Sequence, residues 1–160
     1  MLFRSSKKAI VLALAASLAV PFEGLRQKWY YDPPGILSVC YGYTGKDIDK
    51  TKTYSLAECK ALLDKDMIHA ISITDNCVPG LPAKTLAAWS DAVYNLGPDI
   101  VCNQSKSTAA RFLAEGKLRE ACLQLPRWDK ARVKGVSISL QGLTKRRAAE
   151  MQLCLEGLSQ

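Results

Sequence analysis

Two carboxylic acids near the start of the chain, Glu23 and Asp32, are spaced so that they could act on one bond. Glycosidic cleavage needs a protonated carboxyl group that donates to the leaving oxygen, and an ionised carboxylate that orients water or stabilises the transition state. The apolar stretch before Glu23 favours its neutral form, because burial disfavours a charged carboxylate. Asp32 precedes a Pro-Pro-Gly turn, where N–H groups and water favour the charged form. Ser38 carries a hydroxyl that could bind the same water as Asp32.

Five further segments follow these acids along the chain. They are Cys40–Asp47, Tyr54–Leu63, Ala92–Gly97, Ala121–Trp128 and Gly142–Glu150. In this order, and with the two acids and Ser38, they resemble the phage-type lysozymes, the muramidases with which phages open the bacterial wall. The family pattern is Glu, eight residues, Asp, five residues and Thr. The spacing is kept here, but Ser38 replaces Thr and Tyr43 replaces the usual His.

The resemblance implies an α+β, mostly α, lysozyme-like fold, in which a small N-terminal β-sheet and a helical C-terminal lobe flank a cleft. It implies hydrolysis of the β-1,4 bond between N-acetylmuramic acid and N-acetylglucosamine, with inversion and without a cofactor. Glu23 is then the acid, while Asp32 and Ser38 hold the attacking water. The residues implied in substrate binding are Tyr43, Tyr94, Asn95, Arg146 and Arg147, and one of the two arginines is expected to bond Glu23.

Simpler roles exist for several of these residues. Tyr94 could be a core aromatic and Asn95 an amide near a helix end. Arg146 and Arg147 could lie on a solvated helix face. His69 is the single histidine, and no cysteine or second histidine lies at ligand spacing, so we expect a surface or half-buried residue and no metal site.

Local patterns predict the elements that position these residues. Residues 36–44 read as a short strand or hairpin. A capping box at Ser55 predicts a helix to about Ile71, and the resemblance implies that this helix joins the two lobes. Further helices are predicted from Pro82 to Gly97, from Ser107 to Gly116, from Leu118 to Leu125 and from Thr144 to Leu155.

The N-terminal segment resembles a signal sequence, because Arg4, Lys7 and Lys8 precede the uncharged residues 9–22. This stretch is shorter than the ~20 residues that span a bilayer comfortably. Cleavage within it would leave Glu23 near a new terminus. We therefore expect residues 1–22 to be an uncleaved signal-arrest-release segment, as in a subset of phage endolysins, followed by a muramidase domain over residues 23–160. The alternative is an Ala/Leu-rich helix packed in the core.

Six cysteines indicate an oxidising compartment, and no Cys-x-x-Cys spacing suggests a zinc ribbon or a thioredoxin-like site. Counting alone allows fifteen pairings. The order of the elements suggests Cys40 with Cys59, Cys77 with Cys102, and Cys122 with Cys154. We expect an exported protein that is membrane-tethered and then periplasmic.

The length of 160 residues suits one domain, and the net charge of +7 suits an anionic partner such as the bacterial wall or a membrane surface. A nucleic-acid binder is disfavoured, because its basic residues would interleave with aromatics along one face. A secreted wall-binding or inhibitor protein that lost the chemistry is the main alternative, and the two intact acids argue against it. We expect a monomer that binds peptidoglycan glycan strands and associates transiently with the inner membrane through residues 9–22.

Overall fold

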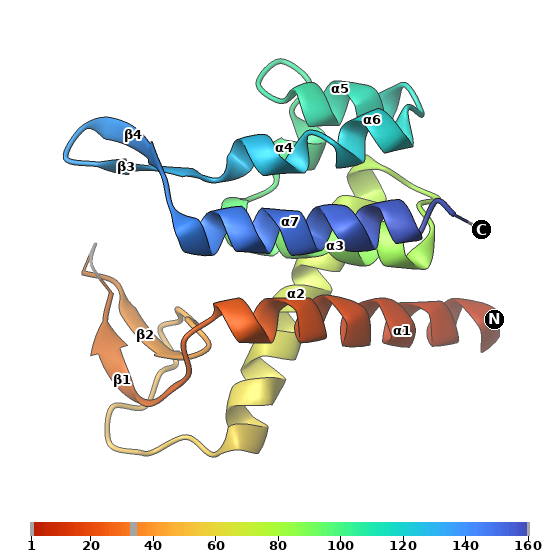
Figure 1. The fold of residues 1–160 in the computed structure, drawn as a ribbon. Coiled ribbons are helices and arrows are strands. Elements are labelled where there is room, and N and C mark those ends of the chain that lie inside the picture. The colour runs from red at the N-terminus through yellow and green to blue at the C-terminus, as the bar shows by residue number, and fades with distance from the viewer. Residues whose placement is uncertain (1, 33–34, 160) are drawn as a thin grey trace.

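The computed structural model describes residues 2–32 and 35–159. A small lobe with one β-hairpin sits beside a larger helical body (Figure 1). The elements in chain order are α1 (Leu2–Ala19), a 3-10 turn (Val20–Phe22), β1 (Arg26–Tyr31), β2 (Leu37–Cys40), α2 (Leu56–Cys77), α3 (Ala83–Leu96), α4 (Asp99–Cys102), α5 (Thr108–Ala114), α6 (Leu118–Cys122), a second 3-10 turn (Leu125–Trp128), β3 (Lys130–Val133), β4 (Val136–Ser139) and α7 (Gln141–Glu156). This architecture confirms the predicted α+β, mostly α class.

Helix α3 is the centre of the helical body and packs against α1, α2 and α7. Pro82 precedes its first turn, and Gly97 ends it with φ 93°, a conformation that a residue without Cβ adopts readily. Every residue from Thr85 to Val93 is buried, and Trp89 is fully enclosed. A helix that is buried all round fixes its neighbours, so α3 sets the positions of the side chains that α1 and α7 bring to it.

Helix α1 lies in the core of the helical body. Its buried residues Val11, Ala15, Ala16 and Ala19 belong to the same apolar cluster as Trp89 of α3. Alanines at this spacing share one face of a helix and allow close packing against α3. No helix in the described part of the chain is both long and apolar enough to cross a membrane.

The small lobe has its own core, formed by Val39, Cys40, Tyr43, Ile48, Tyr54 and Cys59. Strands β1 and β2 pair antiparallel, with an irregular register between Arg26 and Tyr30. Strand β2 confirms part of the predicted strand over residues 36–44. Strand β1 was not predicted, because its sequence does not alternate and most of its side chains are exposed.

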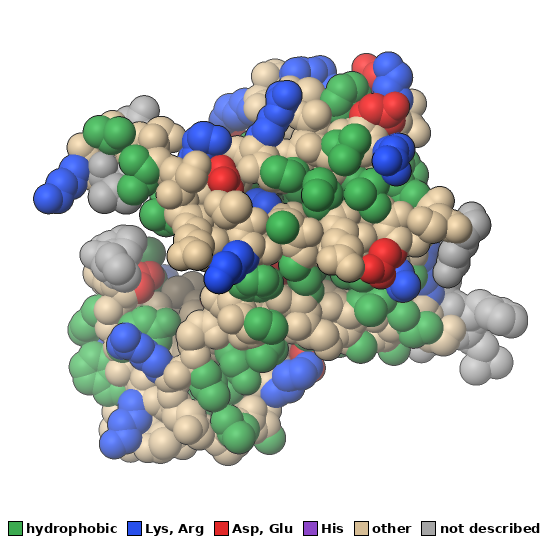
Figure 2. Space-filling model, viewed as in Figure 1, with side chains coloured by type: hydrophobic (Ala, Val, Ile, Leu, Met, Phe, Trp, Pro, Cys, Tyr) green, Lys and Arg blue, Asp and Glu red, His purple; other side chains and the backbone are tan. Residues whose placement is uncertain are grey.

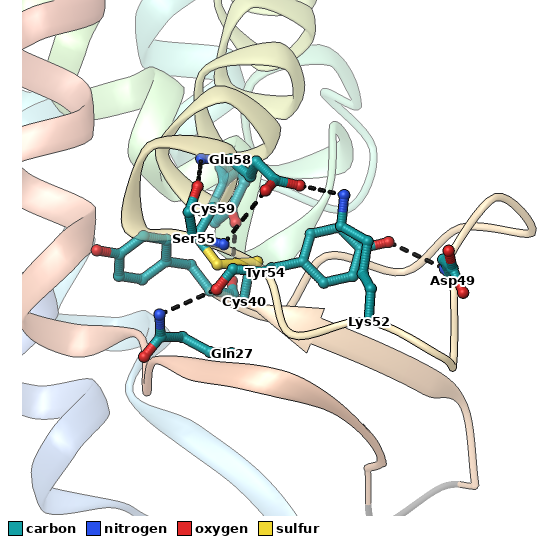
Figure 3. Close-up of a disulfide and its surroundings, with 10 residues drawn as sticks. Gln27, Cys40, Asp49, Lys52, Tyr54, Ser55, Glu58 and Cys59 are labelled. Carbon is teal, nitrogen blue, oxygen red and sulfur yellow. Dashed lines mark hydrogen bonds and ion pairs between the residues drawn. A yellow bond between two sulfur atoms is a disulfide. The ribbon is translucent and has the colours of Figure 1, made fainter.

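The Cys40–Cys59 disulfide ties β2 to the first turns of α2 (Figure 3). Beside it, Ser55 Oγ accepts from the Glu58 N–H and Glu58 Oε1 accepts from the Ser55 N–H, which completes the predicted capping box. Gln27 of β1 donates to the Tyr54 carbonyl at 2.9 Å. These bonds hold the start of α2 against the hairpin.

The other two disulfides lie in the helical body and join the pairs suggested by the order of the elements, Cys77–Cys102 and Cys122–Cys154. The first ties the end of α2 to α4. The second ties α6 to α7. Each bond therefore links segments that pack within one lobe.

Several predicted boundaries were wrong. Helix α2 runs on from Ile71 to Cys77, because no helix breaker occurs before Pro79 and Gly80. Helix α7 begins at Gln141, three residues before the predicted Thr144. The helix expected over residues 118–125 ends at Cys122 and is followed by a 3-10 turn. The short helix α4 was not predicted.

The β3–β4 hairpin was also not predicted. Its two-residue turn has Lys134 and Gly135 at positive φ, 51° and 78°, which suits a type I′ hairpin turn. Strand β4 does alternate apolar and polar residues, but it is only four residues long and all its side chains are exposed, so its apolar residues are not part of a core. Figure 2 shows that the surface is hollowed between this hairpin and the lobe of β1 and β2.

Candidate active site

A cavity of about 460 Å³ lies between the loop after β2, one face of α2 and the end of α3. It is lined by polar and apolar residues together: Glu23, Tyr41, Gly42, Thr44, Asp66, His69, Ala70, Ile73, Val93, Tyr94, Asn95 and Pro98. The cavity therefore brings together residues from both lobes around one predicted catalytic acid.

Glu23 reaches the cavity from the turn that follows α1. Its N–H donates to the Ala19 carbonyl at 3.1 Å, so the residue is an extension of the α1 backbone. Its side chain is 21% exposed, and Oε1 accepts from Arg146 Nη1 at 2.7 Å. Oε2 accepts no hydrogen bond from the described residues and lies beside Gly42, where an added Cβ would stand 3.7 Å away. One carboxyl oxygen is thus held by Arg146, and the other has no hydrogen bond from the described residues.

Arg146 of α7 is held by a second acid, Asp91 of α3. Its Nε and Nη2 donate to the two Asp91 carboxylate oxygens at 3.0 and 2.7 Å, an arrangement that fixes the guanidinium plane. Arg146 is 3% exposed and Asp91 fully buried. Burial alone would lower the pKa of Arg146, but the bonds to Asp91 and Glu23 outweigh it, so the pKa is raised and the charge is secure.

Arg147 is fully buried and forms a second buried pair. Its Nη2 donates to Glu150 Oε1 at 2.7 Å and to Asn95 Oδ1 at 2.8 Å. Burial, together with the Asp91 carboxylate nearby, raises the pKa of Glu150 above its ordinary value. Neither arginine lies on a solvated helix face. The guanidinium of Arg147 is enclosed, and its bond to Oδ1 constrains the Asn95 amide.

Asp32 and Ser38 both bond to Ile36 in the hairpin. Asp32 Oδ1 accepts from the Ile36 N–H at 2.8 Å, and Ser38 Oγ donates to the Ile36 carbonyl at 3.2 Å. Asp32 is half-buried and Ser38 is closed off from solvent. Neither is among the described residues that line the cavity around Glu23. Pro33 and Pro34 of the predicted turn lie outside the described residues.

The predicted substrate-binding residues take different positions. Tyr94 and Asn95 line the cavity, and the Tyr94 hydroxyl donates to the Tyr41 carbonyl at 3.3 Å. Burial and the nearby Glu23 charge raise the pKa of Tyr94, so its hydroxyl stays neutral. Tyr43 lies instead in the core of the small lobe, where it donates to Asp47 at 2.8 Å. Its neighbour Thr44 lines the cavity.

Sequence reasoning missed three acids and a histidine at this site: Asp91 and Glu150 in the buried cluster, and Asp66 and His69 in the cavity wall. Asp91 carries a recognisable signal. It is a lone acid inside the apolar run Leu86–Val93, so helical packing would bury it and a buried carboxylate requires a cation. His69 was expected at or near the surface, and it is exposed in the cavity wall.

The comparisons with known proteins place this site in a family. Residues 20–150 match the family model described as Phage lysozyme. The chain belongs to the phage lysozyme family. It is therefore a lysozyme-type glycoside hydrolase that acts on peptidoglycan. The match begins just before Glu23 and ends at Glu150, so it includes both the cavity and the buried charge cluster.

Two phage proteins named SAR-endolysin illustrate its relatives. The one from Bacteriophage PS119 is 44% identical over 136 residues, which make up 84% of this chain and 77% of that protein. The one from Pseudomonas phage phiKMV is 33% identical over 151 residues, 92% of this chain and 91% of that protein. The second alignment extends over nearly the whole of both chains.

Among solved structures, the muramidase domain of SpmX from Asticaccaulis excentricus is similar with a TM-score of 0.78 and 27% identity, over 88% of this chain and 94% of that one. The active form of the P1 phage endolysin Lyz is similar with a TM-score of 0.75 and 22% identity, over 91% of this chain and 84% of that one. The secreted inactive form of the same endolysin has a TM-score of 0.51 and 22% identity, over 71% of this chain and 77% of that one. The enzyme described here therefore has a fold nearer to the active form than to the inactive one.

Proposed function

We propose that this enzyme is a muramidase that hydrolyses the β-1,4 bond between N-acetylmuramic acid and N-acetylglucosamine, with inversion at the anomeric carbon. Protonated Glu23 gives its proton to the glycosidic oxygen as the bond from that oxygen to the anomeric carbon breaks. Asp32 accepts a proton from the water that attacks the same carbon. Return of that proton to Glu23 through solvent restores both groups.

The observation that carries this proposal is the position of Glu23. Glu23 lines a cavity large enough for part of a sugar chain, with Oε1 held by Arg146 and Oε2 without a hydrogen bond from the described residues. A general acid must present its proton in one defined direction. The bond to Oε1 supplies that direction, and the absence of a side chain at Gly42 leaves room beside Oε2.

The hairpin gives Asp32 and Ser38 a joint role. Because both bond to the backbone of Ile36, Ser38 helps to fix the turn on which Asp32 is carried. Only Asp32 of the two is open to solvent. Ser38 is accordingly a positioning residue that acts through Ile36, and Asp32 is the residue that meets the water.

The relatives named SAR-endolysin support export by signal arrest and release. In this route residues 9–22 are first held in the inner membrane, which keeps Glu23 at the bilayer surface and away from Arg146. Release lets α1 pack on α3, as the buried alanines of α1 do here. The enzyme then acts in the periplasm as a monomer. The likeness of the fold to the active form of the P1 enzyme agrees with a released state.

The test of the proposed chemistry is the Glu23→Gln variant. Its amide oxygen can still accept from Arg146, but it has no transferable proton, and general acid catalysis contributes ~10²–10⁴-fold. We expect clearing of isolated cell walls to fall at least a hundredfold, with new reducing ends of N-acetylmuramic acid formed by wild type alone. Glu115→Gln, at an acid that pairs with Lys117 on the surface, is the matched control and should clear walls normally.

A Glu23→Gln enzyme that clears walls at more than about a tenth of the wild-type rate would show that Glu23 is not the acid. The export route has a separate test, N-terminal sequencing of the released protein. An amino terminus at Val20 or later would show a cleaved signal and refute the release model.

A further inference from the structure

Asp66 and His69 are two groups in the catalytic cavity that the proposed mechanism does not use. They lie about one turn apart on α2 and both line the wall of the cavity that contains Glu23. Asp66 is half-buried, and His69 is exposed. Titratable side chains in the wall of a substrate cavity are candidates for substrate recognition.

The carboxylate of Asp66 lacks a bonding partner. Within residues 2–32 and 35–159 it accepts no hydrogen bond and forms no ion pair. Asp64, on the same helix, is instead paired with Lys60. The pKa of Asp66 is raised, because its burial outweighs the attraction of the positive side chains nearby. A half-buried acceptor without a partner lowers the stability of the free enzyme and is satisfied when a ligand brings a donor.

Asn95 offers the complementary group in the lining of the same cavity. Its Oδ1 is occupied by Arg147, so the amide Nδ2 is the end available to a ligand. Ala70, Ile73 and Val93 add apolar surface to the same cavity. The cavity thus combines a hydrogen-bond acceptor, a hydrogen-bond donor and an apolar wall.

We propose that Asp66 binds the N-acetyl group of a sugar next to the scissile bond, by accepting a hydrogen bond from its amide N–H. The acetyl oxygen accepts from Asn95 Nδ2, and the methyl group packs on Ala70 and Ile73. This assignment rests on the proposed glycan-cleaving function, and it identifies the N-acetyl group as the part of the substrate that the cavity recognises.

The charges around Asp66 favour a neutral donor over the ammonium group of a stem peptide. Lys65 and His69 lie close enough to lower the pKa of Asp66, while Asp47 acts weakly in the opposite direction. Positive charge is therefore already present beside the carboxylate and would repel an incoming cation. An amide N–H carries no net charge and meets no such repulsion.

The test uses the full-length enzyme on two substrates: isolated walls, and glycan strands from which an amidase has removed the stem peptides. Asp66→Ala should raise KM about tenfold on both substrates, with a smaller change in kcat. Asp66→Asn should lose less, because its amide oxygen still accepts a hydrogen bond. Asp64→Ala is the matched control and should leave KM unchanged.

Three results would overturn the assignment. A defect that disappears on stripped strands would mean that Asp66 binds the stem peptide. An unchanged KM in a folded Asp66→Ala enzyme would mean that this acid binds nothing. A rise in KM in the Asp66→Asn variant that equals the rise in Asp66→Ala, and that becomes smaller when salt is added, would indicate that the carboxylate forms an ion pair with the substrate. The Glu23→Gln result is independent of all three, so failure of the general acid assignment would be seen separately.

A double-variant cycle tests whether one group is shared. Asn95→Asp keeps the oxygen that Arg147 needs and removes the Nδ2 donor. If Asp66 and Asn95 hold the same acetamido group, the KM effects of Asp66→Ala and Asn95→Asp will be less than multiplicative in the double variant. Independent, multiplicative effects would show that the two residues bind different groups.

Discussion

Leucine substitutions on the two faces of α1 separate its membrane role from its packing role. Ala13 and Ser17 are exposed on the folded enzyme, whereas Ala15 and Ala16 are buried against the core. We expect the exposed pair, Ala13→Leu with Ser17→Leu, to retain more protein in the membrane and to have normal activity once released. The buried pair, Ala15→Leu with Ala16→Leu, should be retained and should also be damaged after release.

The magnitudes follow from the added carbon atoms and their surroundings. Ala→Leu adds three carbons, about 2.4 kcal/mol of transfer free energy at most, since each buried methylene contributes ~0.8 kcal/mol. Ala15→Leu with Ala16→Leu therefore favours the membrane by up to about 5 kcal/mol, roughly a thousandfold in the ratio of held to released protein. The exposed pair is favoured at least as much, because Ser17→Leu also removes a polar hydroxyl. On the buried face, overpacking adds a cost of ~1–3 kcal/mol per site to the folded state.

The assay has two parts for each variant. The first measures the fraction of full-length protein in the membrane pellet after expression. In the second part, that protein is solubilised, and the midpoint of its unfolding in urea and its rate of clearing isolated walls are measured. Equal midpoints for the buried pair and wild type would refute the packing of α1 described here. Lost activity in the solubilised exposed pair would show that the outer face of α1 has a role beyond membrane retention.

Two further predictions concern single acids. Asp91→Ala should lower the free energy of unfolding in urea by ~3–5 kcal/mol, because it leaves Arg146 buried without its bidentate partner. Glu156→Ala removes an ion pair with Lys84 in which the side chains of Lys84 and Glu156 are 42% and 45% exposed. This variant should change the free energy of unfolding by less than ~1 kcal/mol. Equal losses of stability in the Asp91→Ala and Glu156→Ala variants would contradict the buried network. Asp66→Asn should stabilise the enzyme relative to wild type at pH 7 but not at pH 3.5. The pKa of Asp66 is raised by folding from its ordinary value of 3.8, so at a pH above 3.8 the charged carboxylate lowers the stability of the folded enzyme, and the neutral amide removes this cost. A stability difference that is the same at both pH values would show that the Asp66 charge is not the cause.

The elements that sequence predicts well are those set by neighbours along the chain. The capping box of Ser55 and Glu58 starts α2 through bonds that span three residues. Gly97 ends α3 because it adopts a positive φ. The disulfides could be inferred because each joins elements that pack as near neighbours in the predicted order. Such features depend on short-range sterics and hydrogen bonds.

The elements that sequence reasoning missed depend on tertiary contacts or on weak local signals. The strands of the β3–β4 hairpin are four residues each, and the alternating residues of β4 are all exposed, so the local signal is short. The far end of α2 carries Thr74, a weak helix former that is buried and donates its hydroxyl to the Ala70 carbonyl at 2.8 Å. Tertiary packing overrides propensity at such positions.

By itself the sequence determined the spacing of Glu23 and Asp32, the mostly helical class and the resemblance that points to muramidase chemistry. The resemblance indicated that one of two arginines bonds Glu23, but only the tertiary structure decided which of them does so and which acid holds it in place. Arg146 lies 123 positions away from Glu23 and 55 from Asp91, and its buried charge joins the two. A sequence can show that a buried acid needs a cation, because an unpaired charge is costly in the interior. Which cation meets it depends on how α1, α3 and α7 pack, and no local pattern along the chain encodes that arrangement.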